Sequence, residues 1–457
     1  MGHPLNLKNK RIVVVGLGRS GVATARFLAA QGARVTVTDR APAETLKTAA
    51  AVLDGLGVDL KLGGHDTTDF ETADLVVLSP GVPHTLPMLE SAWAKGTPVI
   101  GEVELACGFI TEPILAVTGT NGKTTTTELV GNMLRNSGKH VFVGGNIGTP
   151  LIAYVDGSHD QVDVVVAEIS SFQLDTIIDF RPDTAVMLNI TDDHLDRYPT
   201  FSAYADSKWR IFENQRPTDA AVLNAMDATV AAMIKNHPPR ARRKFISDGV
   251  IDKGAQILKD RIILIEAGRQ TGSFSLSESG LIGLHNRENT AAACLAAREQ
   301  GASDAGIQRA IDEFQGLSHR LETVGWVRGV RFVNDSKATN VDAVNRALEC
   351  FDNPVILIMG GQNKKGDFAQ LKSQVRRRVK TLVAMGEAKD EIVTALAGDP
   401  EKGILEAGSM EEAVEKAFAA AADGEIVLLS PACASFDMFA NYAQRGNRFR
   451  EIVERLG

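Results

Sequence analysis

The chain has 457 residues, of which 44% are hydrophobic and 23% charged, and its formal net charge is −8. This length exceeds what one hydrophobic core usually supports, and it predicts about three domains. The ordinary apolar content argues against disorder. The acidic balance argues against a nucleic acid or an anionic membrane surface as the partner.

The cysteines and the apolar runs favour a location inside the cell. Cys107, Cys294, Cys350 and Cys433 are scattered without a CxxC pair, which is typical of reduced thiols and not of a disulfide framework or a zinc site. The first residues, MGHPLNLKNKR, have no apolar segment after their charges, so we expect no signal peptide. No apolar run approaches the ~18 residues of a membrane span. The sequence therefore predicts a soluble, cytoplasmic protein without membrane insertion.

Short β-branched runs alternate with alanine-rich amphipathic stretches, a pattern that predicts βαβ units and mostly parallel sheets. The expected strands form three series: 11–16, 33–39 and 74–81; 113–120, 140–145, 162–170 and 183–194; 331–336, 353–361, 381–386 and 425–432. A polar, strand-like patch at 256–268 and a long helix at 286–300 separate the second series from the third. We predict three α/β domains, at residues 1–107, 108–316 and 317–457.

The first expected domain opens with a dinucleotide-type glycine motif, VVVGLGRSG. Gly16, Gly18 and Gly21 have the required spacing, and Asp39 ends the second expected strand. In this motif the backbone approaches a diphosphate closely and the carboxylate binds a ribose. An NAD-dependent oxidoreductase and a protein that binds a UDP-sugar both satisfy the pattern, so the motif alone leaves the ligand open.

The second expected domain contains a phosphate-binding motif with an unusual spelling, TGTNGKT. The common pattern needs a glycine six residues before Lys123, and Val117 occupies that position. A strand, a glycine turn and a helix N-terminus still form an anion site, because N–H groups and the helix dipole favour negative charge. Lys123 would reach the β- and γ-phosphates, and the hydroxyl of Thr124 suits Mg²⁺. The alternative is a plain strand–turn–helix with an exposed lysine.

Three polar residues later in the same expected domain add to the interpretation. Glu168 ends an expected strand, where a carboxylate can hold Mg²⁺ across from the loop. His194 ends the next strand, and Lys208 lies in an expected helix. Taken singly, these residues are typical of a solvated acid, a structural histidine and a surface lysine.

Eight short motifs follow one another as TGTNGKT, GGNIGTP, EISSFQL, NITDDHLDRY, GLHNREN, HRLE, NDSKATN and SPACASFD. Together they resemble the Mur ligase family of ATP-dependent amide-forming enzymes over nearly the whole chain. The resemblance implies a Rossmann-like N-terminal domain, a P-loop-type central ATPase domain and a Rossmann-like C-terminal domain. It also implies a monomeric, cytoplasmic enzyme of peptidoglycan precursor synthesis that uses ATP and two Mg²⁺ ions.

The resemblance also assigns roles to residues at matched positions of these motifs. It implies ATP-binding residues Gly119, Thr120, Asn121, Gly122, Lys123, Thr124, Thr125, Asn286, Asn289, Arg320 and Asp335. It implies Mg²⁺ ligands at Thr124, Glu168, His194 and a carbamylated Lys208, since a bare ammonium would repel a divalent cation. The implied catalytic residues are Lys123, His194, Lys208 and Lys337.

The implied substrates are UDP-N-acetylmuramoyl-L-alanine at the first domain and D-glutamate at the third. The UDP-side residues are Gly16, Gly18, Ser20, Asp39, Ser79, Gly81 and Asn146. The glutamate-side residues are Thr339, Lys364, Ser435, Phe436 and Tyr442, since two carboxylates need cationic and hydroxyl donors. Thr339 and Ser435 also suit N-caps of helices expected at 341–350 and 436–445. Lys365 follows Lys364 directly, and Tyr442 stands where the family pattern has phenylalanine.

The implied reaction begins with transfer of the γ-phosphoryl group of ATP to the alanyl carboxylate. The amine of D-glutamate then attacks the acyl phosphate, because an unactivated carboxylate would have to expel oxide. One alternative is another Mur-type or folylpolyglutamate-type ligase, although the chain lacks the DNPR segment of the ligase that adds a diamino acid. The more distant alternatives are an NAD-dependent oxidoreductase and a regulatory nucleotide-binding module.

Overall fold

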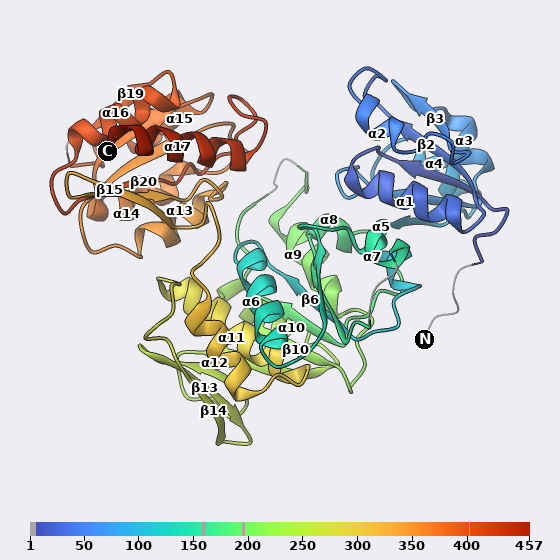
Figure 1. Ribbon diagram of the computed structural model, residues 1–457, viewed down its shortest axis with the longest axis horizontal. Coiled ribbons are helices and arrows are strands. Elements are labelled where there is room, and N and C mark those ends of the chain that lie inside the picture. Colours follow the sequence, from blue (N-terminus) through green and yellow to red (C-terminus); the bar gives the residue numbers. More distant parts are fainter. Residues whose placement is uncertain (1–5, 158–160, 194–196, 402) are drawn as a thin grey trace.

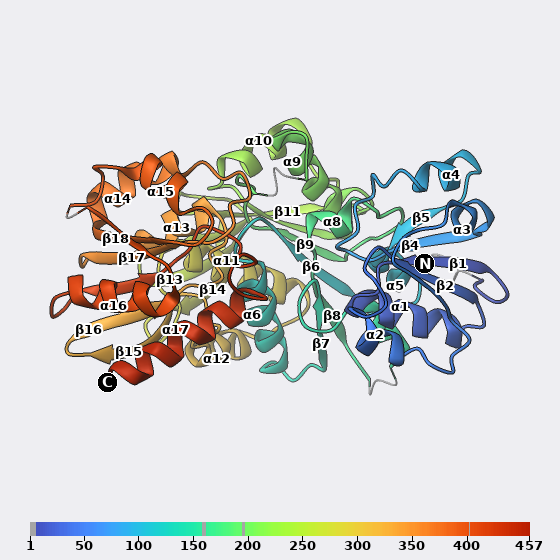
Figure 2. The same ribbon diagram turned by 90° about the horizontal axis from the view of Figure 1, so that it is seen from above.

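The structure, a computed structural model, describes residues 6–157, 161–193, 197–401 and 403–457. It contains three sheets in three lobes, with the N-terminal lobe (blue) and the C-terminal lobe (orange and red) on opposite sides of the central one (Figures 1 and 2). The predicted α/β class with three sheet-containing domains is confirmed. In the described ranges, no helix combines the length and the apolar character needed to pass through a bilayer.

The N-terminal sheet is entirely parallel and has the strand order β3-β2-β1-β4-β5. Its strands are β1 (Arg11–Val15), β2 (Arg34–Asp39), β3 (Asp59–Leu62), β4 (Leu75–Leu78) and β5 (Val99–Gly101). Its helices are α1 (Arg19–Ala30), α2 (Lys47–Ala51), α3 (Thr67–Thr72), α4 (Leu89–Ala94) and α5 (Glu102–Cys107). The strand order reverses between β1 and β4, so the loops after these strands border a crevice at the carboxyl edge of the sheet.

The central sheet has the order β14-β13-β12-β11-β10-β9-β6-β8-β7. Its strands are β6 (Ile114–Thr118), β7 (Val141–Gly145), β8 (Val164–Glu168), β9 (Thr184–Met187), β10 (Ala220–Asn224), β11 (Arg242–Ser247), β12 (Gly254–Ile257), β13 (Arg261–Glu266) and β14 (Arg269–Ser275). β13 pairs antiparallel with both of its neighbours, β12 and β14, and the strands of the other pairs in this sheet are parallel. Every residue of β6 is buried, as its continuous apolar run predicts for a strand covered on both faces.

Helices cover the central sheet and carry several of the predicted site residues. They are α6 (Lys123–Arg135), α7 (Leu151–Asp156), α8 (Ser171–Leu174), α9 (Phe201–Trp209), the 3₁₀ turn η1 (Arg210–Phe212), α10 (Ala228–Asn236), α11 (Leu284–Glu299) and α12 (Asp304–Glu313). The alanine-rich face of α11 is buried against α6 and the sheet, which explains why small residues dominate this helix.

The C-terminal sheet has the order β15-β16-β20-β17-β18-β19, and only β15 and β16 are antiparallel. Its strands are β15 (Glu322–Val327), β16 (Val330–Asn334), β17 (Val355–Gly360), β18 (Val379–Met385), β19 (Ile404–Ala407) and β20 (Ile426–Leu429). Its helices are α13 (Val341–Leu348), η2 (Phe368–Leu371), α14 (Lys372–Arg378), α15 (Lys389–Leu396), α16 (Met410–Ala420) and α17 (Tyr442–Leu456).

Two helix caps expected in the C-terminal domain are wrong. The N-cap of α13 is Asn340, whose Oδ1 accepts a hydrogen bond from the N–H of Ala343 at 2.9 Å, and not Thr339. The helix expected after Ser435 begins only at Tyr442, because Asn441 is its cap. Asparagine is at least as strong an N-cap as serine or threonine, so both helices start beside the asparagine.

Helix α5 ties the N-terminal lobe to the central one through two buried carboxylates. Glu104 accepts three backbone N–H bonds of 2.8 to 3.0 Å from residues 178–180. Oε1 of Glu102 accepts from the N–H of Ile152 at 2.7 Å, near the N-terminus of α7. Burial raises the pKa of Glu102 to about 7. Both contacts fix the approach of the first sheet to the second.

Candidate active site

The central glycine loop leads from β6 into α6. Gly122 has a φ of 86°, and the helix begins at the next residue, Lys123. A Cβ at Gly122 would lie 2.2 Å from Oδ1 of Asn289, so both the backbone angle and the close approach require glycine. None of the described side chains caps α6 by a hydrogen bond. This helix end is therefore suited to an external anion.

Lys123 lies folded over this loop. Its Nζ donates to the backbone oxygens of Gly119 at 2.9 Å and Thr120 at 2.8 Å. Burial lowers the pKa of the ammonium, and the carboxylates of Glu168 and Asp193 oppose this shift. The position is that of a cation held where phosphate oxygens would approach the helix N-terminus.

A row of hydrogen bonds joins the end of β8 to the C-terminal domain across this loop. Oγ1 of Thr124 donates to Oε2 of Glu168 at 2.8 Å, and Nη2 of Arg320 donates to the same hydroxyl at 2.9 Å. The other oxygen of Glu168 accepts from Nδ2 of Asn146 at 2.8 Å. We call these residues the Glu168–Thr124–Arg320 row.

Two oxygen donors of this row fit Mg²⁺, which prefers carboxylate and hydroxyl ligands completed by water and phosphate. Glu168 is almost fully buried at the end of β8, and Thr124 lies beside it. In the described part of the chain, no three histidine, cysteine or acidic residues gather into a metal cluster. The predicted ligand His194 lies outside the described residues. The fit therefore rests on Thr124 and Glu168, with the remaining ligands supplied by phosphate and water.

Lys208 is buried on α9 and faces the same loop. Its Nζ donates to the oxygen of Gly119 at 2.8 Å and lies 4.8 Å from the ring centre of Tyr204. Burial lowers the pKa of Lys208 well below its ordinary value, and the nearby ammonium of Lys123 lowers it further. Taken singly, Lys208 was expected to be a surface lysine. In the structure its amine is buried.

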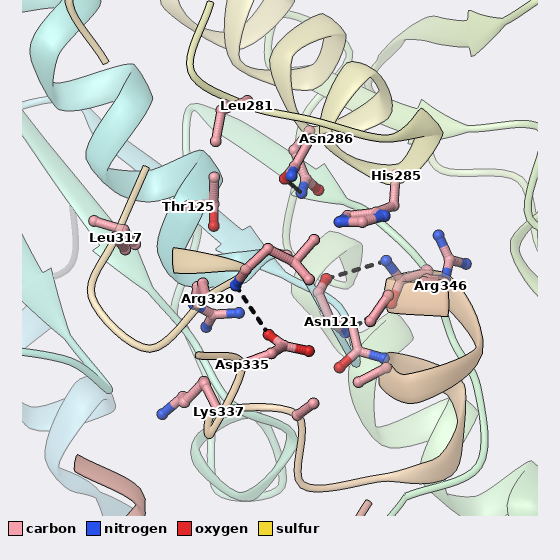
Figure 3. Close-up of a pocket in the computed structure, with 17 residues that line it drawn as sticks. Asn121, Thr125, Leu281, His285, Asn286, Leu317, Arg320, Asp335, Lys337 and Arg346 are labelled. Carbon is pink, nitrogen blue, oxygen red and sulfur yellow. Dashed lines mark hydrogen bonds between the residues drawn. The ribbon is translucent and has the colours of Figure 1, made fainter. Parts of the chain in front are cut away.

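A pocket between the central and C-terminal domains contains most of the predicted ATP-side residues. Figure 3 shows His285 and Asn286 on one side of it and Arg320, Asp335 and Lys337 on the other. Nδ2 of Asn289 donates to Oδ1 of Asn286 at 3.2 Å, which orders the two predicted amides. Other residues that line this pocket include Asn121, Gly122, Thr125, Leu281, Leu317, Ala343 and Arg346.

The C-terminal side of this pocket contains two groups with shifted proton affinity. Asp335 accepts from the N–H of Leu321 at 3.2 Å and from Oγ of Ser430 at 2.9 Å, and burial raises its pKa to about 7. Burial lowers the pKa of Lys337 to about 7. The Lys337 ammonium lies 3.6 Å from the ring centre of Tyr442, a cation–π contact that favours its charged form.

A second pocket between the same two domains brings together Thr339 and Lys364 from the predicted glutamate side. Nζ of Lys364 donates to Oδ1 of Asp193 at 2.7 Å, and Nδ2 of Asn340 donates to the other oxygen at 3.2 Å. Lys365 also lines this pocket. Ser435 (buried), Phe436 (70% exposed) and Tyr442 are not among its lining residues.

The crevice of the N-terminal sheet is a third pocket, lined by all seven predicted UDP-side residues: Gly16, Gly18, Ser20, Asp39, Ser79, Gly81 and Asn146. Asp39 accepts from the N–H groups of Leu17 at 2.7 Å and Ala41 at 2.8 Å. Oγ of Ser79 donates to the oxygen of Gly16 at 2.9 Å. A Cβ at Gly21 would lie 1.9 Å from that same oxygen, so the turn requires a glycine there.

Several pocket residues escaped the sequence analysis. His285 and Arg346 line the first pocket, Asp193 pairs with Lys364 in the second, and Arg40 and His65 line the third. A signal was available for three of them, since His285 directly precedes Asn286, Asp193 directly precedes His194 and Arg40 directly follows Asp39. His65 and Arg346 come from stretches without a motif. Burial lowers the pKa of His285 to about 4, so its ring is neutral at neutral pH.

The three sheets and the glycine loop after β6 place this chain in the class of three-domain α/β proteins with a phosphate-loop-type central domain. Three family descriptions match it in order. They are the Mur ligase MurD-like N-terminal domain at residues 10–101, the Mur ligase middle domain at 117–297 and the Mur ligase glutamate ligase domain at 319–433. The chain belongs to the Mur ligase family.

Relatives are similar over the full length of the chain. The UDP-N-acetylmuramoylalanine–D-glutamate ligase of Desulfosudis oleivorans is 48% identical over 454 residues, which cover 99% of this chain and 98% of that protein. The ligase of the same name from Desulfatibacillum aliphaticivorans is 49% identical over 452 residues, covering 99% and 100%.

Solved structures share the fold. A pseudomurein peptide ligase type C from Methanothermus fervidus superposes with a TM-score of 0.61 at 21% identity, covering 98% of this chain and 100% of that one. The MurF ligase from Thermotoga maritima in complex with ADP gives 0.58 at 17% identity, covering 84% and 96%. At these identities the likeness concerns the fold alone.

Proposed function

We propose that this protein is an ATP-dependent ligase that adds D-glutamate to UDP-N-acetylmuramoyl-L-alanine in peptidoglycan precursor synthesis. The names of the full-length relatives support the substrates. The Glu168–Thr124–Arg320 row is the observation that carries the chemistry, because it unites a phosphate-loop hydroxyl, a carboxylate and a cation from another domain.

The proposed division of labour follows the three expected domains. Residues 1–107 bind the UDP-linked substrate, 108–316 bind ATP and 317–457 bind D-glutamate. The N-terminal pocket supports the first assignment because its walls come from a glycine loop, an acidic strand end and Asn146 of the central domain. The pocket with Thr339 and Lys364 supports the third, since an amino acid with two carboxylates needs a cation and a hydroxyl. A cytoplasmic location and a monomeric state belong to the same proposal.

The proposed chemistry activates a carboxylate that is otherwise inert toward amines. The alanyl carboxylate attacks the γ-phosphorus of ATP, ADP leaves, and an acyl phosphate forms. The amine of D-glutamate attacks the acyl carbon, and inorganic phosphate leaves as the amide forms. Lys123 and Arg320 would hold the phosphoryl oxygens, since such transfer depends mainly on positioning and charge stabilisation.

Two Mg²⁺ ions would supply the charge neutralisation that a triphosphate and an attacking carboxylate require. Thr124 and Glu168 would hold one ion. His194 and Lys208 are proposed for the other. Lys208 would bind as a carbamate, formed when its neutral amine adds to CO₂ and releases a proton. Its lowered pKa supports this step, because only the unprotonated amine is a nucleophile.

An assay of phosphate release from ATP tests the proposal. With UDP-N-acetylmuramoyl-L-alanine present, we expect release with D-glutamate and little with L-glutamate, and no consumption of NADH or NADPH. Phosphate release that needs another amino acid would point to a different member of the family. Oxidation of a nicotinamide cofactor without ATP turnover would contradict the proposed chemistry altogether.

A further inference from the structure

The wall of the N-terminal pocket is fastened to the central domain by one arginine. The loop after β4, residues 79–84, contributes Ser79, Gly81 and Val82 to this pocket. Arg197 of the central domain donates from Nη1 to the oxygen of Gly81 at 3.2 Å and from Nη2 to the oxygen of Val82 at 2.9 Å. Both bonds cross between domains, so the arginine sets where this wall stands relative to the central sheet.

The guanidinium is itself held on an aromatic platform. It lies 3.9 Å from the ring centre of Phe172 on α8, and that ring stacks with Tyr198 at 5.9 Å and 15°. Oη of Tyr198 donates to Asp175 at 2.7 Å, and Asp175 also lies 3.6 Å from Nδ1 of His84. Within the part of the chain that the structure describes, the loop that forms the pocket wall is therefore joined to the central domain through Arg197 and also through His84.

The platform stands on the elements that carry the candidate metal residues. Phe172 follows Glu168 by one short turn of chain, and Tyr198 Oη lies 3.2 Å from Oγ of Ser207, the residue before Lys208. Ser207 in turn donates to the oxygen of Ser171 at 3.0 Å. The ring platform is thus anchored on the scaffold of the phosphate loop, whereas the hydrogen bonds of Arg197 itself go to the pocket wall.

We infer that Arg197 is a positioning residue for the UDP-linked substrate. It fixes the Gly81–Val82 wall so that the diphosphate end is held at the distance that places the reacting carboxylate at the central loop. The role needs arginine, because a planar guanidinium stacks on a ring and donates two parallel bonds at once, whereas lysine offers a single point charge. The inference rests on the proposed function, since it assumes a substrate that reaches from one pocket to the other.

Calorimetric binding of UDP-N-acetylmuramoyl-L-alanine without ATP, together with steady-state kinetics, tests this inference. We expect Arg197→Ala to weaken binding and to raise KM for this substrate by about tenfold, while KM for ATP and for D-glutamate changes by less than about twofold. Arg197→Lys should bind this substrate more weakly than the wild type and more tightly than Arg197→Ala, since it keeps the charge but loses the planar guanidinium. Arg331→Ala is a matched control: Arg331 also stacks over a ring, Trp326, and donates twice to Thr323, but it lies on β16 outside the pockets. It should bind and turn over as the wild type does.

The outcomes separate the two proposals. If the wild type fails to bind UDP-N-acetylmuramoyl-L-alanine, the proposed function falls, and this inference falls with it. If the wild type binds and Arg197→Ala binds equally tightly, only the inference is overturned. An equal rise of KM for all three substrates with a lowered Tm would also overturn it, because that result marks a general loss of stability.

Discussion

The glycine loop after β1 and the glycine loop after β6 each lead from a buried parallel strand into a helix whose N-terminus borders a pocket. Their surroundings differ. Around the first, Asp39 and Ser79 hold the backbone of the loop itself. Around the second, Lys123 and the Glu168–Thr124–Arg320 row surround the helix end with charge. The same strand–glycine loop–helix arrangement is thus suited to holding a ligand in the N-terminal domain and to stabilising charge in the central domain.

The glycines in the two loops are required for different reasons. A side chain at Gly21 would collide with the oxygen of Gly16, within the same loop. A side chain at Gly122 would collide with Asn289 of α11, which lies far away in sequence. The first loop is therefore a self-contained turn, whereas the second is shaped by a helix that also lines the proposed nucleotide pocket.

Of the changes that test this difference between the two loops, replacement of Lys123 should have the largest effect. We expect Lys123→Ala to lower kcat by at least about 10²-fold, because it removes a cation held at the phosphate-binding helix end. Phosphate release at saturating substrates measures this effect. Arg19→Ala, in the first loop, is the matched variant and should change kcat by less than about tenfold. Wild-type turnover in Lys123→Ala would remove the charge-stabilising role of the second loop.

Lys208 tests the charge around the second loop in another way. We expect Lys208→Ala to lose about 10²-fold in kcat, as disturbed metal sites commonly do, and to recover in part when a short carboxylate such as acetate is added. The added carboxylate would replace the proposed carbamate. Lys235→Ala, an exposed lysine on α10, should keep full activity. If no short carboxylate restores activity, the carbamate hypothesis is wrong.

Asp39, which ends β2 beside the first loop, should affect binding of the UDP-linked substrate and not turnover. We expect Asp39→Asn to raise KM for the UDP-linked substrate by about tenfold, because the amide keeps one uncharged acceptor oxygen and its NH2 group cannot accept from the second backbone N–H, either that of Leu17 or that of Ala41. KM for ATP should stay as in the wild type. A fall in kcat as large as that of Lys123→Ala would contradict the distinction between the two loops.

The smallest expected effect is on stability and concerns Glu102, at the junction of the N-terminal and central lobes. Because burial raises its pKa from an ordinary value near 4.5 to about 7, the folded state keeps a proton that the unfolded chain releases. This contribution is complete below pH 4.5 and is lost as the pH rises to 7, a change of up to about 3 kcal/mol. We expect Tm of the wild type to fall by several degrees relative to Glu102→Gln across this window. The exposed Glu90→Gln should follow the wild type, and identical pH profiles for all three proteins would refute the prediction.

Much of the fold could be predicted because its signals are local. The β-branched runs predicted buried parallel strands, and the positions of the glycines predicted both loops. The polar strand β14 was missed because Phe274 is the only large apolar residue among its seven, so its half-buried face has no apolar alternation in the sequence. The starts of α13 and α17 were misplaced because capping depends on which of several polar side chains reaches the first N–H groups.

The candidate site could be predicted only where a motif marks it. The motifs located both loops, Glu168 and Lys208, although the roles of these residues remain predictions. Pairs such as Lys364 with Asp193 could not be predicted, because they form between domains whose relative placement the sequence pattern does not specify. The contact of Arg197 could not be predicted for the same reason: the residue lies in the NITDDHLDRY motif, but its partners are backbone oxygens of another domain.

The pair of Lys364 and Asp193 has a consequence for how an acidic amino acid enters. The ammonium has a partner before any ligand arrives, so the domains meet without enclosing a lone cation. In the proposed reaction, a carboxylate of D-glutamate would have to displace Asp193 from Lys364. Asp193 would keep its hydrogen bond from Asn340 and would attract the amino group of the same substrate. An amino acid would therefore satisfy both members of the pair, whereas a simple dicarboxylate would satisfy only one.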